Sequence, residues 1–77
     1  MDLIKAIELL DAVSDFQFKA LEKRPNVRIY GSRNDGYNLW IKANLVNEEY
    51  RNHLKEVAKL RKLWMRESRG YLIIYDY

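Results

Sequence analysis

The chain has 77 residues, no cysteine and a formal net charge of +3 at pH 7. This length allows one domain over residues 1–77, with a small core and little stability to spare. Without cysteine the fold has neither disulfides nor zinc–thiolate sites, so packing or self-association must stabilise it.

Residues 2–23 are predicted to form the first helix. At about 100° per residue, apolar and charged side chains separate onto two sides. The apolar side holds Leu3, Ile7, Leu10, Val13, Phe18 and Leu21, and the charged side holds Glu8, Asp11, Asp15, Lys19 and Glu22. Ser14 and Gln17 match a capping box, so a helix that restarts at Ser14 is an alternative to one continuous helix. Pro25 closes the element.

The segments "VRIYG" (27–31) and "YNLWIK" (37–42) predict a β-hairpin. Both alternate between apolar and polar residues, and "SRNDG" between them is a strong turn sequence. If the apolar residues of both arms share one face, the loop must contain an odd number of residues. The other face then carries Arg28, Tyr30, Asn38, Trp40 and Lys42.

The second helix is predicted to begin after Asn47, a good N-cap, and to run to about Arg66, with Gly70 ending it. "YLIIYDY" (71–77) then predicts a terminal strand. The order is α-β-β-α-β, an α+β fold with a three-stranded, mainly antiparallel sheet packed with two helices. A ferredoxin-like arrangement lacking its first strand gives this order and places the last strand beside the first.

Catalytic and metal-binding chemistry have little support in the sequence. The candidate nucleophiles are Ser14, Ser32 and Ser68, and His53 is the single histidine. A general base needs a partner and a pocket, and one histidine with scattered carboxylates gives no metal-ligand spacing. We therefore expect no enzymatic activity, no metal and no cofactor.

The sequence carries no sign of membrane insertion or export. No apolar run approaches the ~20 residues that span a bilayer. The N-terminal segment is interrupted by Lys5 and Glu8 and is unlike a signal peptide. We expect a cytoplasmic protein with no membrane partner.

The predicted second helix carries a narrow basic ridge formed by Arg51, Lys55, Lys59, Lys62 and Arg66. One interpretation is phosphate binding, which is strongly salt-dependent. The alternative is charge that is solvated, or paired with acidic residues of the first helix within the chain or across a homodimer. Arg61 falls on the apolar side, so we expect an internal salt bridge to Asp76 or Glu22.

The second unusual surface is the hairpin face that carries Arg28, Tyr30, Trp40 and Lys42, with Tyr71 and Tyr75 added if the last strand joins the same sheet. RNA-recognition modules stack bases on aromatic side chains of an open sheet. The other interpretations are a protein or dimer interface, or a face covered by part of the first helix.

These features predict a small intracellular binding module. The first hypothesis is sequence-nonspecific binding of DNA or RNA, with phosphates on the basic ridge and bases on the aromatic sheet face. The alternative is a protein-binding module that uses the aromatic face, either a homodimer or a small phage- or mobile-element-type inhibitor of a host protein. Salt separates the two, because a phosphate binder loses affinity with ionic strength and an apolar interface barely responds.

Overall fold

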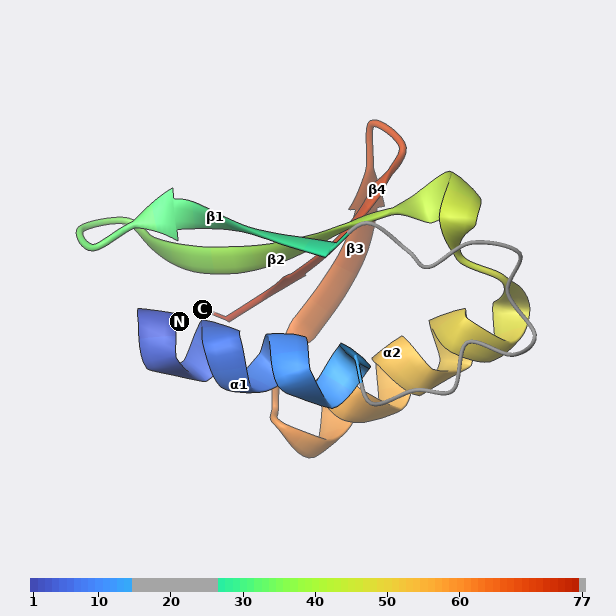
Figure 1. Cartoon of the computed structure of the whole chain (residues 1–77), viewed down its shortest axis with the longest axis horizontal. Helices are drawn as coiled ribbons and strands as arrows, with labels where there is room; N and C mark the ends of the chain where they lie inside the picture. The colour runs from blue at the N-terminus through green and yellow to red at the C-terminus, as the bar shows by residue number, and fades with distance from the viewer. Residues whose placement is uncertain (15–26, 77) are drawn as a thin grey trace.

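The computed structural model describes residues 1–14 and 27–76. It contains the helices α1 (Leu3–Ser14) and α2 (Glu48–Leu60), a short 3₁₀ helix η2 (Ala43–Leu45), and the strands β1 (Val27–Ser32), β2 (Gly36–Lys42), β3 (Trp64–Ser68) and β4 (Tyr71–Tyr75). The strands form one sheet in the order β1-β2-β4-β3, and every neighbouring pair is antiparallel (Figure 1). The α+β class is therefore confirmed.

The sheet has four strands, so the three-stranded prediction is wrong. The second helix ends at Leu60 instead of continuing to Arg66. Lys62 adopts a left-handed conformation with φ 57, and the Leu63 N–H donates to the Ala58 carbonyl over 2.8 Å. This pattern is typical of a helix C-terminus whose left-handed residue is usually glycine. The residues that follow become β3.

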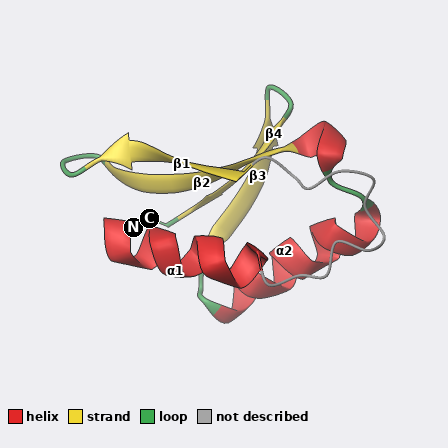
Figure 2. Ribbon diagram, in the orientation of Figure 1, coloured by secondary structure: helices red, strands yellow, loops and turns green. Residues whose placement is uncertain are grey.

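The position of the last strand also differs from the prediction. Strand β4 lies between β2 and β3 and does not pair with β1, so the ferredoxin-like arrangement is not confirmed. A tight turn at Arg69 and Gly70 connects β3 to β4, and both residues have positive φ. Figure 2 shows the sheet twisting so that β3 and β4 run at a steep angle to β1 and β2.

The first hairpin follows the predicted register. Val27 pairs with Ile41 and Ile29 pairs with Leu39, and three residues form the connecting turn. The hydroxyl of Ser32 accepts a hydrogen bond from the Asp35 N–H at the start of this turn, over 3.1 Å. The alternation of apolar residues therefore predicted the register correctly.

Both helices pack on the same face of the sheet (Figure 1), and the core lies between the two layers. The buried side chains that form this core cluster are Leu9 and Val13 of α1, Leu39 and Ile41 of β2, Tyr50, Leu54, Val57 and Ala58 of α2, and Leu72 and Ile74 of β4. None of the described helices is long and apolar enough to cross a membrane.

Helix α1 buries a different stripe from the predicted one. Ala6, Leu9 and Val13 are buried, whereas Leu3 and Ile7, which were predicted to be core residues, remain half-exposed. Leucine and isoleucine occupy more than half of the helix circumference, so the sequence alone did not determine which part packs. The predicted continuation to residue 23, with its alternative restart involving Gln17, lies outside the described residues.

Tyr50 connects the two helices at the centre of the core. Its ring is fully buried, and its hydroxyl donates to the Val13 carbonyl over 3.1 Å. The Tyr50 N–H donates to the side chain of Asn47 over 2.8 Å, which confirms Asn47 as the N-cap of α2. The start of α2 is thus tied directly to the end of α1.

Gly31 allows the close approach of β1 and β2 near their turn. Its φ is +135, and a Cβ placed there would lie 2.1 Å from the Gly36 carbonyl oxygen, a backbone atom that cannot rotate away. Gly70 also has a positive φ, of +82, but a Cβ there would meet nothing within 4 Å. A side chain at Gly31 would therefore cause both a steric clash and backbone strain, whereas a side chain at Gly70 would cause backbone strain alone.

We predict that Gly31→Ala destabilises the fold much more than Gly70→Ala. Gly70→Ala introduces only left-handed strain, about 1–2 kcal/mol. Gly31→Ala adds a backbone clash and should cost at least about 2 kcal/mol more. Urea unfolding followed by circular dichroism measures both losses, and equal losses would show that the two strands separate to accept the methyl group.

Candidate nucleic-acid interface

The sheet face opposite the helices forms a continuous surface across the four strands. Strand pairing places one set of alternating side chains on this face: Arg28, Tyr30, Asn38, Trp40, Lys42, Trp64, Arg66, Ser68, Tyr71, Ile73 and Tyr75. We call this surface the outer face. Neither described helix lies on it, because α1 and α2 both pack on the opposite side (Figure 1).

Three aromatic rings form a row across the outer face. Tyr30 on β1 meets Trp40 on β2 edge-on, with ring centroids 5.3 Å apart. Trp40 in turn lies 5.5 Å from the ring of Tyr71 on β4. Such aromatic pairs stabilise their own arrangement, so the row is held in place before any ligand binds.

Trp40 is the structural centre of this row. Its indole N–H is buried and finds no hydrogen-bond acceptor in the part of the chain that the structure describes. Leaving a buried donor unsatisfied costs about 1–3 kcal/mol, so ring packing must decide where Trp40 lies. The ring of Tyr30 is more accessible, at 46% exposed, whereas Tyr71 is half-buried like Trp40.

Basic side chains flank the aromatic row. Arg28 and Lys42 join Tyr30, Trp40 and Tyr71 in lining a hollow of about 200 Å³. The structure therefore brings together the four hairpin residues predicted for this face and Tyr71, which was expected there if the last strand joined the same sheet. Among the described residues that line this hollow, none is acidic.

Arg66 also belongs to the outer face, not to the predicted helical ridge. It lies on β3, and its guanidinium carbon is 5.5 Å from the centre of the Tyr75 ring. It pairs across the ladder with Ile73, which is only 3% exposed although it faces away from the helices. The outer face thus has a small apolar floor beneath its charged and aromatic side chains.

The predicted basic ridge is broken by the early end of α2. Arg51, Lys55 and Lys59 are on the helix, but Lys62 lies in the following turn and Arg66 lies on β3. Arg51 already donates to the Glu67 carboxylate over 3.0 Å. Only Lys55 and Lys59 therefore remain as neighbouring exposed cations on α2, in the layer opposite the outer face.

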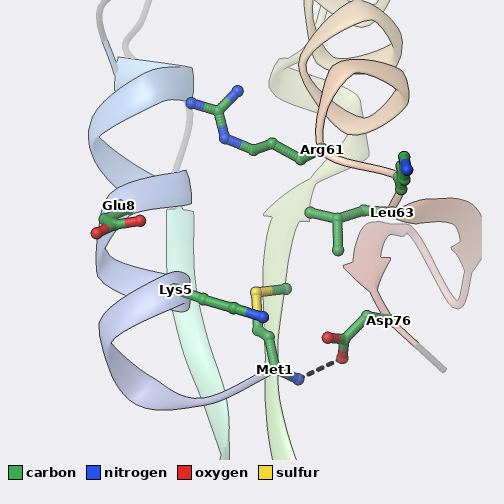
Figure 3. A pocket seen from close by; sticks show the side chains of 7 residues that line it. Met1, Lys5, Glu8, Arg61, Leu63 and Asp76 are labelled. Atoms are coloured by element: carbon green, nitrogen blue, oxygen red, sulfur yellow. Dashed lines mark hydrogen bonds and ion pairs between the residues drawn. The ribbon is translucent and has the colours of Figure 1, made fainter.

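A second hollow, of about 420 Å³, lies between α1 and the end of α2 (Figure 3). Met1, Lys5, Glu8, Arg61, Lys62, Leu63 and Asp76 line it. The predicted bridge from Arg61 to Asp76 is wrong, because the Asp76 carboxylate pairs with the N-terminal ammonium group of Met1. Arg61 is exposed instead, and its other predicted partner, Glu22, lies outside the described residues.

The candidate catalytic residues do not form a constellation. His53 packs beside the Tyr50 ring, with centroids 6.1 Å apart, and the Ser32 hydroxyl is used in the β1–β2 turn. Within residues 1–14 and 27–76, no three His, Cys, Asp or Glu side chains are grouped so that they could hold a metal ion. The outer face is therefore the better candidate site.

Sequence reasoning missed Trp64 as an outer-face residue, because the second helix was predicted to continue to about Arg66 and so included Trp64. A signal was present. "WMRES" and "YLIIY" flank Arg69 and Gly70, and a two-residue turn between alternating segments predicts a hairpin. Arginine is an unusual residue at the first position of such a turn, where asparagine is preferred, and this hid the hairpin.

Comparison with known proteins found no matching family model, no matching curated sequence and no matching solved structure.

The β3–β4 turn gives a direct test of this hairpin, which places Arg66, Trp64 and Tyr71 on the outer face. Arg69 has φ 51, a conformation that asparagine adopts more readily. We predict that Arg69→Asn raises the free energy of unfolding by about 0.5–1 kcal/mol. Arg33→Asn in the other turn is the control and should change it by less than about 0.5 kcal/mol. A loss of stability in Arg69→Asn would contradict the assigned turn.

Proposed function

We propose that this protein is a small binding module that binds single-stranded nucleic acid, without sequence specificity, through its outer face. The observation that carries this proposal is the aromatic row formed by Tyr30, Trp40 and Tyr71, flanked by Arg28 and Lys42. Proteins that bind single strands combine stacking platforms with cations that follow the phosphate backbone.

The chemistry of the outer face favours single strands over duplexes. Any base offers a π-face to an aromatic ring, and this interaction is tolerant of sequence. In a duplex those π-faces are stacked on one another and are hidden from the protein. The cations Arg28, Lys42 and Arg66 lie on three different strands of the sheet and can each meet a phosphate of a chain that crosses it.

The helix cations have a smaller role in this proposal. Arg51 is engaged with Glu67, and Lys55, Lys59 and Lys62 lie in the helical layer. These residues raise the positive potential of the whole molecule, which speeds encounter with polyanions. They are not placed to contact a strand that lies on the outer face.

A protein-binding module is the second candidate, and a separate observation favours it. Leu3, Ile4 and Ile7 of α1 are exposed, with Ile4 70% accessible. Neighbouring exposed aliphatic side chains commonly mark a protein interface. Binding through this stripe, by a homodimer or by a protein target, would be insensitive to salt and would leave the outer face unused.

We predict that charge reversal on the outer face abolishes nucleic-acid binding. The variant Arg28→Glu with Lys42→Glu should lower affinity for a fluorescent single-stranded oligonucleotide by at least about tenfold at low salt. The matched control is Lys55→Glu with Lys59→Glu, which changes the net charge equally and should lower affinity by less than about threefold. Fluorescence anisotropy at several salt concentrations measures both.

The two outcomes that would contradict this prediction are distinct. Equal losses in the two variants would show that net charge alone drives binding. No binding by the unmodified protein, to DNA or RNA at low salt, would eliminate the nucleic-acid proposal and favour the protein-binding candidate.

Stacking gives an independent prediction at Tyr30. Removing a stacked ring costs about 1–3 kcal/mol, so Tyr30→Ala should weaken binding by roughly 5- to 150-fold. Tyr30→Phe keeps the ring and should bind nearly as well as the unmodified protein. Because neither variant changes charge, the salt dependence of affinity should stay the same in both. Equal affinity of Tyr30→Ala and Tyr30→Phe would exclude stacking on this ring.

A further inference from the structure

Strand β3 leaves one edge of the sheet open and carries apolar side chains beside it. It pairs only with β4 among the described residues. Trp64 at its start is 61% exposed, and Leu60 just before it is 76% exposed. An unpaired strand edge with exposed apolar side chains is a template for another strand.

The other edge of the sheet is less suited to pairing. Strand β1 contains Gly31 at φ +135, outside the conformations of a regular strand. Strand β3, by contrast, contains no residue with positive φ, so its five residues form an uninterrupted edge. A regular strand is needed for a continuous ladder of backbone hydrogen bonds.

The β3–β4 turn decides which backbone groups of β3 face the open edge. Ser68 and Tyr71 flank the two-residue turn and so form its closing pair. In such a hairpin the closing pair exchanges both of its backbone hydrogen bonds, and the pattern alternates along the ladder. The backbone groups of Arg66 and Trp64 therefore face β4, and those of Met65 and Glu67 face outward.

We propose that the open edge of β3 pairs with β3 of a second copy of this chain, antiparallel about a two-fold axis at Met65. In this register Met65 lies opposite Met65 of the second copy, and Trp64 lies opposite Arg66 on the outer face, twice. Directly opposed side chains in such a ladder lie close enough for a cation–π contact.

Charge complementarity selects this register over its neighbours. A two-fold axis at Arg66 would place two guanidinium groups directly opposite each other, and an axis at Glu67 would do the same to two carboxylates. Like charges directly opposite are destabilising. Of these three axes, only the one at Met65 opposes apolar to apolar and cation to aromatic ring. All three keep both helical layers on one side of a joined sheet.

This inference does not depend on nucleic-acid binding, although the joined sheet would double the length of the outer face.

The first test is Met65→Pro. Proline removes the outward N–H that the second copy needs, and the ladder to β4 does not use that N–H. Met65→Ala removes the same side chain but keeps the N–H and is the matched control.

Light scattering and sedimentation over a range of protein concentrations measure the result. The unmodified protein and Met65→Ala should reach twice the 9.3 kDa mass of one chain, and Met65→Pro should remain at 9.3 kDa with an unchanged circular dichroism spectrum. An unmodified protein that stays at 9.3 kDa at all concentrations would overturn the proposal, as would a Met65→Pro variant that dimerises equally well.

Crosslinking tests the register even if Met65→Pro fails to fold. The chain has no cysteine, so a single introduced thiol reacts alone. Met65→Cys lies at the two-fold axis and should be joined by a short bis-maleimide into a covalent dimer. Glu67→Cys is displaced from its symmetry mate by four positions, about 14 Å along the strand, and should not be joined. Efficient joining of Glu67→Cys but not Met65→Cys would overturn the proposed register.

Discussion

The hydrogen bond from the Tyr50 hydroxyl to the Val13 carbonyl determines how the two layers meet, because it ties the end of α1 to the start of α2 inside the core. A buried tyrosine hydroxyl needs an acceptor, and the Val13 carbonyl provides it over 3.1 Å. The bond holds both helices on the same side of the sheet. Neither α1 nor α2 therefore covers the outer face (Figure 1).

Successive side chains of each strand point to opposite faces of the sheet, so the face toward the helices and the outer face differ in chemistry. Ile41 and Leu72 face the helices, whereas Trp40 and Ile73, their neighbours in sequence, face the other way. A sheet with one packed and one open face normally shows polar residues on the open side. Here the open side carries an aromatic row and the buried Ile73, although neither described helix covers it.

The sequence predicted correctly those segments whose apolar residues fit only one period, either that of a strand or that of a helix. The hairpin register was correct because only a period of two fits Val27, Ile29, Leu39 and Ile41. The second helix was extended too far because Leu60 and Trp64 also fit a helical period and Lys62 stands where glycine would mark the end. The same error assigned Arg66 to the helical ridge instead of the sheet, while Arg28, Tyr30, Trp40 and Lys42 were predicted to share one sheet face, as they do.

Two basic residues with left-handed backbone conformations explain why the hairpin of β3 and β4 was hard to predict from the sequence. Lys62 and Arg69 have φ values of 57 and 51, at turn positions where glycine or asparagine is more stable. Each costs on the order of 1 kcal/mol, a substantial share of the stability of so small a domain. The two residues lie at opposite ends of β3, so the strand that the sequence concealed is bordered on both sides by a turn whose conformation its own residue disfavours.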